Sequence, residues 1–284
     1  MHEIDRIRRA LEETPRGVLV TVVRTKGSTY RRAGARAVIA EDGRVTGAIS
    51  GGCLERDLAE RVRPWLVTME RRLVTYDSTR EDDLVFGMGL GCRGILELLV
   101  EPFDAMHRPP LASFAWRGRE PVEWATRLPD GTTMFELLQP QRAIVVFGGG
   151  PDVAPVLRLA ENVGWRADAV TTREPVPLDD YDAAVVMTHN FERDAELLPR
   201  LLESHLAYIG MLGPRKRGEE LLGDRIRDHR IHTPVGLDLG SETPEEIALS
   251  IVAEIQATLQ RRSARPLREL AVPIHEPADK PACV

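Results

Sequence analysis

The chain has 284 residues, of which 43% are hydrophobic and 29% are charged, and its formal net charge is −6. This composition is that of an ordinary globular protein with room for about two domains. It excludes a general nucleic-acid binder, which would carry a strong basic excess, and no apolar run reaches the ~18 residues of a membrane span.

Cysteine usage indicates a reducing compartment. The three cysteines are Cys53, Cys92 and Cys283, an odd number with no C-x-x-C pair. This is not the pattern of a disulfide scaffold or of a structural zinc site. The first residues are charged and lack the apolar segment of a signal peptide. We therefore expect a cytoplasmic protein whose thiols are free to act as nucleophiles or soft metal ligands.

Residues 1–139 predict a mixed α+β domain. An amphipathic helix is expected first, followed by a β-branched strand, a hairpin and a second helix that begins at Cys53 and ends between Pro64 and about Thr68. Further strands follow, and one of them is expected to stop at Pro102. The segments are helices 4–12 and 53 to about 68 and strands 17–23, 35–40, 45–49, 72–76, 95–100, 114–124 and 134–138.

Two glycine-rich turns each carry a cysteine. The first is Ser50-Gly51-Gly52-Cys53-Leu54-Glu55 and the second is Gly89-Leu90-Gly91-Cys92-Arg93-Gly94. Glycine lets a ligand approach the main chain closely, and a helix N-terminus favours an anion such as a thiolate or phosphate. We predict Cys53 and Cys92 as reacting thiols, Cys53 also as a metal ligand, and Gly51, Gly52 and Glu55 as cofactor-binding residues. The alternative is two tight turns, each with a small buried cysteine.

A basic loop precedes the hairpin. Residues 26–34 carry three cations, hydroxyl groups and two glycines. Arginine can grip a phosphate with two hydrogen bonds, and hydroxyls can donate to it. Ser28 and Arg31 are therefore candidate phosphate ligands, against the alternative of a solvated loop.

Residues 140–264 change to strand–helix alternation, which predicts a Rossmann-like parallel α/β domain. A buried strand runs into Gly148-Gly149-Gly150, so Gly148 and Gly150 are candidate nucleotide ligands. The fingerprint is partial, because Val153 takes the third glycine position and Arg173 stands where a ribose-binding carboxylate would be. A doubly wound domain without a nicotinamide cofactor is therefore the alternative. A further strand edge is expected at 236–240, and residues 265–284, with four prolines, are expected to form a loose tail.

Three more candidates follow strands of this second domain. His189 comes directly after a strand, at the sheet edge where ligands bind in open parallel sheets. Arg215 and Arg217 follow Pro214 at a helix start, where they make a candidate anion pocket. Cations oppose the helix dipole at that end, which favours a ligand-binding role. The alternative for His189 is a capped surface histidine.

These motifs together resemble the XdhC/CoxI family of xanthine dehydrogenase accessory proteins, over nearly the whole chain. The resemblance rests on the ordered stretches 27–31, 47–55, 87–92, 147–150, 187–194, 208–217, 234–240 and 243–248. It implies a molybdenum-cofactor chaperone that holds molybdopterin and passes it to a hydroxylase of the xanthine dehydrogenase or carbon monoxide dehydrogenase type. Two positions depart from the family pattern: Arg93, where a glycine is more common, and Thr171-Thr172-Arg173, where many members carry Asp followed by Arg.

Two alternative functions remain at this stage. One is an NAD(P)-dependent oxidoreductase that uses the 148–150 turn, with His189 near the chemistry. The other is thiol-based sulfur transfer through Cys53 and Cys92, with a cysteine desulfurase as partner. We expect a homo-oligomer in each case, and for the molybdenum-cofactor chaperone we expect an accessory protein rather than an enzyme.

Overall fold

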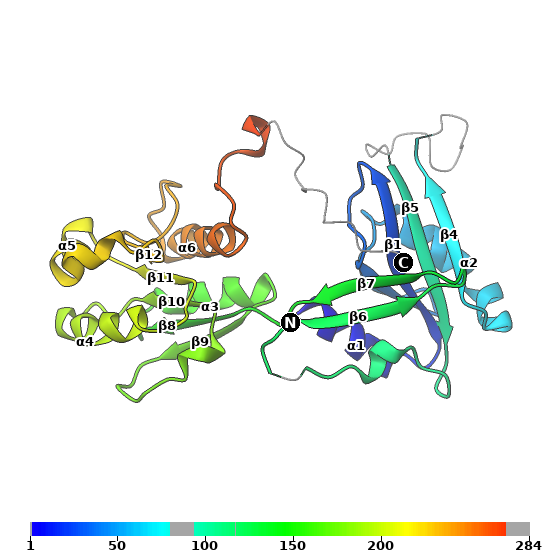
Figure 1. Cartoon of the computed structure of the whole chain (residues 1–284), viewed down its shortest axis with the longest axis horizontal. Helices are drawn as coiled ribbons and strands as arrows, with labels where there is room; N and C mark the ends of the chain where they lie inside the picture. The colour runs from blue at the N-terminus through cyan, green and yellow to red at the C-terminus, as the bar shows by residue number, and fades with distance from the viewer. Residues whose placement is uncertain (1, 80–93, 117, 271–284) are drawn as a thin grey trace. The chain divides into compact units, whose positions relative to one another are not determined.

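The chain forms two compact units, which divide between Pro140 and Gln141. The computed structural model describes residues 2–79, 94–116 and 118–270 (Figure 1). Each unit has its own sheet and its own hydrophobic cores. The predicted fold class, a mixed α+β domain followed by a Rossmann-like α/β domain, is confirmed. Within the described ranges, no helix has the length and apolar character that crossing a membrane requires.

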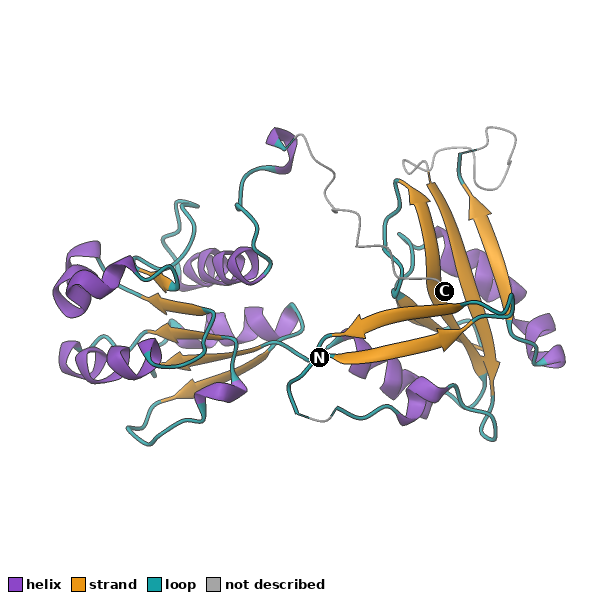
Figure 2. Cartoon of the chain, in the orientation of Figure 1, coloured by secondary structure: helices purple, strands orange, loops and turns teal. Residues whose placement is uncertain are grey.

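The N-terminal unit is built on a five-stranded antiparallel sheet in the order β3-β2-β1-β5-β4 (Figure 2). Its apolar strands β1 and β2 lie inside the sheet, where both faces are covered. The strands are β1 (Gly17–Gly27), β2 (Arg36–Ala40), β3 (Val45–Gly47), β4 (Arg72–Asp77) and β5 (Gly94–Phe103).

Strand β5 continues through Pro102, so the predicted end at this residue is wrong. Pro102 faces Val18 of β1, whereas β4 reaches only as far as Val100 on the other side of β5. At Pro102 the strand therefore has a neighbour on one side only. Proline is tolerated at such an edge position, because its missing N–H removes no ladder bond.

Side chains of β1 alternate between two cores. Val18, Val20 and Val22 face helix α2 (Cys53–Thr68). Leu19 and Val23 face the opposite side, which is covered by helix α1 and the β6–β7 hairpin. The unit is therefore layered as helix, sheet, and helix plus hairpin. The covering elements are α1 (Glu3–Glu13), the turn η1 (Pro110–Ser113), β6 (Val122–Arg127) and β7 (Thr133–Leu138).

Helix α2 continues past Pro64 and ends at Thr68, within the range expected from the sequence. Pro64 and Glu60, whose carbonyl loses its partner, both lie on the exposed side of the helix, where water can satisfy that oxygen. Val62 and Leu66 are buried on the opposite side. Their burial holds the last turn, and each such side chain contributes roughly 1.5–3 kcal/mol.

The C-terminal unit has a five-stranded parallel sheet in the order β12-β11-β10-β8-β9. Helices α3 and α6 cover one face, and α4 and α5 cover the other (Figure 2). The strand edge predicted at 236–240 does not form, and the two-residue strand β12 takes the edge position. The elements are β8 (Ala143–Phe147), α3 (Val153–Asn162), β9 (Arg166–Val170), η2 (Leu178–Asp180), β10 (Ala183–Val186), α4 (Phe191–Leu202), β11 (Tyr208–Met211), α5 (Arg215–Leu222), η3 (Gly223–Arg227), β12 (Ile231–His232), α6 (Pro244–Leu259) and η4 (Leu267–Glu269).

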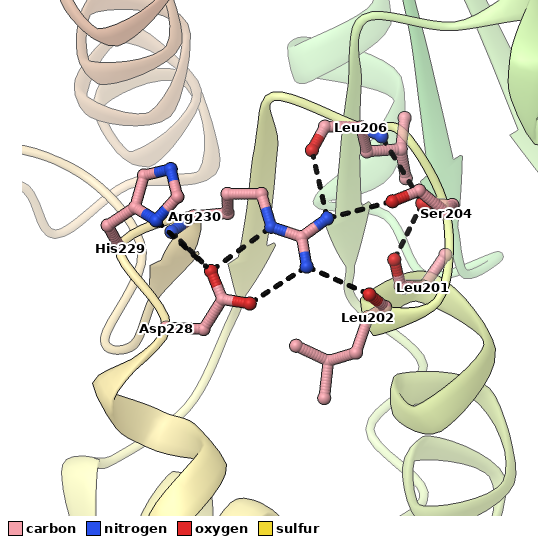
Figure 3. Close-up of polar contacts among 7 residues, drawn as sticks. All are labelled: Leu201, Leu202, Ser204, Leu206, Asp228, His229 and Arg230. Carbon is pink, nitrogen blue, oxygen red and sulfur yellow. Dashed lines mark hydrogen bonds and ion pairs between the residues drawn. The ribbon is translucent and has the colours of Figure 1, made fainter.

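Arg230 connects the end of α4 to the edge of this sheet (Figure 3). Its guanidinium donates to the carbonyl oxygens of Leu202 and Ser204, both at 2.8 Å, and to the Asp228 carboxylate at 2.8 Å. A cation is favourable at a helix C-terminus, where the last carbonyls lack intrahelical partners. This contact fixes the start of β12 beside the α4 end.

Candidate functional site

Cys53 is an exposed free thiol and the first residue of α2. The residue before it, Gly52, has φ 108°, a conformation that glycine adopts without strain. A Cβ added at Gly51 or Gly52 would meet no atom of the described residues within 4 Å, so these residues leave the space beside the thiol open. Among the described residues no group of three or more His, Cys, Asp and Glu is placed to hold a metal. Among these residues, Cys53 therefore offers one soft ligand and no complete metal site.

The buried Glu55 carboxylate organises this turn from within. One oxygen accepts from the N–H groups of Ile49 at 2.8 Å and Ser50 at 2.7 Å, and the other accepts from Gly52 N–H at 3.1 Å and from the Ser50 hydroxyl. Burial alone would raise the pKa of Glu55, but these hydrogen bonds outweigh it and lower the pKa. Glu55 thus positions the cysteine; its contact with a cofactor stays a prediction.

Cys92 lies outside the described residues, so a site shared by Cys53 and Cys92 stays a prediction. The described residues that flank 80–93 include Ser78 and Gly94. They lie side by side: Ser78 N–H donates to the Gly94 carbonyl at 3.0 Å, and Gly94 N–H donates to the Ser78 hydroxyl at 3.0 Å.

The basic loop is tied to the first helix. Arg31 donates to Glu3 of α1 at 2.6 Å, and the Thr29 hydroxyl donates to the Arg31 carbonyl at 2.9 Å. Ser28 is exposed. A phosphate bound here would compete with Glu3 for the Arg31 guanidinium. The phosphate-binding role of Ser28 and Arg31 stays a prediction.

The C-terminal unit has a second candidate region where its strand order reverses, between β8 and β10. In open parallel sheets, ligands bind in the crevice at this reversal. Gly148 packs so closely against the chain after β10 that an added Cβ would collide with the Met187 carbonyl oxygen. A Cβ added at Gly150 would lie 2.4 Å from the Asp152 side chain. The two glycines therefore serve the close approach of β8 to β10 and the tight turn after it, whatever they bind.

His189 stands at the same sheet edge in a strained conformation, with φ 54°. Its Nε2 lies 2.8 Å from Asp152 Oδ2. The other Asp152 oxygen, Oδ1, is buried and has no hydrogen-bond partner among the described residues. Asp152 was not among the predicted site residues, although its place two residues after Gly150 in a glycine turn was a usable signal.

The two arginines of the predicted anion pocket, Arg215 and Arg217, have different surroundings in the structure. Arg217 donates to Asp194 of α4, a residue only 1% exposed that also accepts from the Thr188 hydroxyl. Arg215 is exposed at the start of α5. Arg217 therefore neutralises a buried carboxylate, whereas Arg215 and Lys216 remain exposed to a ligand.

Taken together, these features define a two-unit protein with an exposed thiol on a glycine turn and a Rossmann-like domain. Residues 144–255 match the protein family described as "XdhC Rossmann domain". Residues 10–77 match the family described as "XdhC and CoxI family". The chain is 32% identical to a Bacillus subtilis protein named as a probable xanthine dehydrogenase subunit, over 88% of this chain and 96% of that protein. The chain belongs to the XdhC and CoxI family, which confirms the resemblance seen in the sequence.

Two further relatives extend this comparison. The Escherichia coli molybdenum cofactor insertion chaperone PaoD is 25% identical, over 84% of this chain and 82% of that protein. A crystal structure of a xanthine dehydrogenase from Bacillus halodurans superposes with a TM-score of 0.80 at 28% identity, covering 95% of this chain and 98% of that one.

Proposed function

We propose that this protein binds the molybdenum cofactor and supports its maturation and insertion into a molybdenum hydroxylase of the xanthine dehydrogenase type. The names of the relatives support an accessory role in xanthine dehydrogenase biogenesis. One observation carries the molecular part: Cys53 offers an exposed thiol beside two glycines, and no atom in the part of the chain that the structure describes lies where their side chains would be. A thiolate is a soft ligand of the kind that molybdenum and its sulfur accept.

The cofactor fits this turn chemically. Molybdopterin presents a metal–sulfur end and a phosphate, and the turn supplies one sulfur ligand at the N-terminus of a 16-residue helix. Cys53 would hold the metal or its sulfur, and Glu55 would hold the turn in the shape that presents the thiol.

The test is cofactor binding and transfer with the full chain. Molybdopterin retained after anaerobic incubation is measured for the parent protein and for Cys53→Ala, and delivery is scored by activation of an apo-hydroxylase. We expect Cys53→Ala to lose most of both signals and Cys283→Ala, the matched control, to keep them. Equal retention and delivery by Cys53→Ala would remove Cys53 from the site.

Sulfur transfer is a second candidate that the exposed thiol favours. After incubation with a cysteine desulfurase and cysteine, intact-protein mass spectrometry should show a mass increase of one sulfur on the parent chain. That increase should be absent in Cys53→Ala if Cys53 carries the persulfide. The same experiment with Cys92→Ala assigns the second thiol.

Nucleotide binding is a third candidate, favoured by the close glycine turn and by His189 at the reversal of the sheet. Arg173 is paired with Glu196 at 3.2 Å, and both side chains are more than half exposed, so a 2′-phosphate can displace the carboxylate. Calorimetric titration with NAD and NADP tests this. NADP binding that is weakened by Arg173→Ala would support an oxidoreductase. If neither NAD nor NADP gives a heat of binding, the oxidoreductase alternative is excluded.

A further inference from the structure

The crevice of the C-terminal unit lies where β8 and β10, which are neighbours in the sheet, send the helices that follow them to opposite faces. In a dinucleotide site of this fold, the second glycine of the turn after the first strand lets the backbone approach the pyrophosphate closely. Gly150 holds that position here. The groups that lie against Gly150 therefore decide whether a pyrophosphate can come close to the turn.

The space against Gly150 is taken by side chains of the protein itself. A Cβ added at Gly150 would lie 2.4 Å from Asp152 Oδ1 and 3.7 Å from His189 Cδ2. Asp152 reaches this space from the start of α3, and His189 reaches it from the chain that follows β10. A glycine is thus required at position 150 by an internal contact, with no need of a ligand.

Asp152 and His189 hold each other across the crevice. His189 Nε2 lies 2.8 Å from Asp152 Oδ2, and the Asp152 side chain is only 13% exposed. Asp152 is the N-cap residue of α3, yet its side chain makes no capping hydrogen bond. Its carboxylate therefore serves the crevice and leaves the N–H groups of the first helical turn uncapped by this side chain.

The Asp152 carboxylate brings a negative charge to the position that a pyrophosphate would occupy. Its Oδ1 is buried and has no hydrogen-bond partner among the described residues. A helix N-terminus normally attracts a phosphate, but at α3 the protein's own carboxylate lies beside that end. Like charges at close range repel, and they do so more strongly away from bulk water. A phosphate at Gly150 would have to displace Asp152.

The backbone at His189 supports the same arrangement. Its φ of 54° is uncommon for a residue other than glycine. Such strain persists only where the surrounding structure holds it, and it is concentrated at ligand clamps and switch regions. The His189 side chain is 58% exposed, so its hydrogen bond to Asp152 is open to competition from solvent. The contact is therefore suited to closing the crevice reversibly.

We propose that the Asp152–His189 pair is an internal plug that closes the phosphate position of the Rossmann-like unit. In the parent chain, the plug excludes ligands that place a pyrophosphate on the glycine turn, such as ADP and NAD. Removal of the Asp152 carboxylate opens the position, so Asp152 is the residue that determines this selectivity. The inference goes beyond the proposed function, because it uses neither Cys53 nor the molybdenum cofactor, and it counts against the nucleotide-binding alternative.

The test is calorimetric titration of the full chain with ADP, for the parent protein, Asp152→Ser and Asp152→Asn. Serine is a good N-cap residue and removes both charge and volume, whereas asparagine keeps the volume and removes only the charge. We expect both variants to bind ADP at least about tenfold more tightly than the parent chain, because a like charge is gone. Asp179→Ser removes an exposed acid of the same unit and is the matched control, which should bind like the parent.

The remaining outcomes also decide the matter. A gain in Asp152→Ser alone supports the plug and assigns the exclusion to volume. A parent chain that binds ADP as tightly as Asp152→Ser would overturn the proposal, and so would absence of binding in every protein whose thermal unfolding shows it to be folded. Binding by the parent chain only with Mg²⁺ present would also overturn it, because Asp152 would then hold a cation that attracts the phosphate. Molybdopterin retention through Cys53 is measured separately, so the two proposals fail independently.

Discussion

The backbone N–H of Ser50 donates to the Glu55 carboxylate, 2.7 Å away, across the turn that presents Cys53. The same carboxylate also receives the N–H groups of Ile49 and Gly52. Three main-chain donors at the start of a helix are thus satisfied by one buried side chain. The exposed thiol owes its position to a carboxylate that is itself 6% exposed.

Glu55→Gln should destabilise the N-terminal unit and loosen this turn. The amide offers one acceptor oxygen and turns an NH₂ group toward main-chain donors. Because hydrogen bonds to a charged group contribute about 1.5–3 kcal/mol each, we expect a loss of about 2 kcal/mol in the free energy of unfolding. Urea unfolding measures it. Glu60→Gln, on the exposed side of the same helix, is the control, and an equal effect of both changes would contradict the positioning role.

Gly47→Ala should be far more harmful than Gly43→Ala. Both glycines have positive φ, 93° and 87°, so each substitution brings a backbone penalty of roughly 1 kcal/mol. A Cβ at Gly47 would also collide with the Arg36 carbonyl and lie 2.6 Å from Ile7 Cδ1, whereas a Cβ at Gly43 meets no described residue within 4 Å. Thermal unfolding should show a small shift for Gly43→Ala and a shift at least twice as large for Gly47→Ala. Similar shifts for the two variants would mean that Ile7 of α1 moves aside at little cost in stability.

The sequence predicted the elements wherever local pattern and packing agree. Helix α1, predicted over 4–12, is observed over Glu3–Glu13, because its apolar residues recur at helical spacing on one buried face. One proline misled the prediction. Pro102 was expected to end a strand, yet it lies at an unpaired strand edge, where its missing N–H costs little. Pro64 lies on an exposed helix face, where its missing N–H also costs little, and the helix runs on to Thr68.

The candidate site was predictable as a set of residues but not as a set of contacts. The Cys53 turn follows from glycine spacing alone. The pairing of Arg217 with Asp194, of Arg31 with Glu3 and of His189 with Asp152 joins residues 23 to 37 positions apart. Sequence pattern gives no signal for such pairs without an alignment of relatives. Three predicted ligands therefore have partners within the protein.

Acid should weaken the contact between Asp228 and Arg230. The Arg230 side chain and backbone N–H donate to this carboxylate and hold the pKa of Asp228 at about 2, below its ordinary 3.8. The folded-state pKa is depressed, so the stabilisation is complete above pH 3.8 and is lost as the pH falls toward 2. Denaturant midpoints measured between pH 5 and pH 2 should fall less in Asp228→Asn than in the parent chain. Parallel curves for the two proteins would show that this pair contributes no pH dependence.

Asp194→Ala should be one of the most damaging single changes in the C-terminal unit. Asp194 joins the end of β10, through the Thr188 hydroxyl, to Arg217 of α5. Its loss leaves Arg217, 23% exposed, without its counter-charge. Breaking a buried pair costs about 3–5 kcal/mol, and the partial exposure of Arg217 places our expectation near 3 kcal/mol.

Two comparisons separate the buried charge from general fragility. Glu196 lies in the same helix as Asp194 and forms an exposed ion pair with Arg173. Glu196→Ala should lower the free energy of unfolding by less than about 1 kcal/mol. The double variant Asp194→Ala with Arg217→Met should recover part of the loss, because no unpaired charge remains. Urea unfolding of the four proteins decides it. If Asp194→Ala and Glu196→Ala cost the same, or if the double variant recovers nothing, the Asp194–Arg217 pair does not hold α5 to the sheet edge.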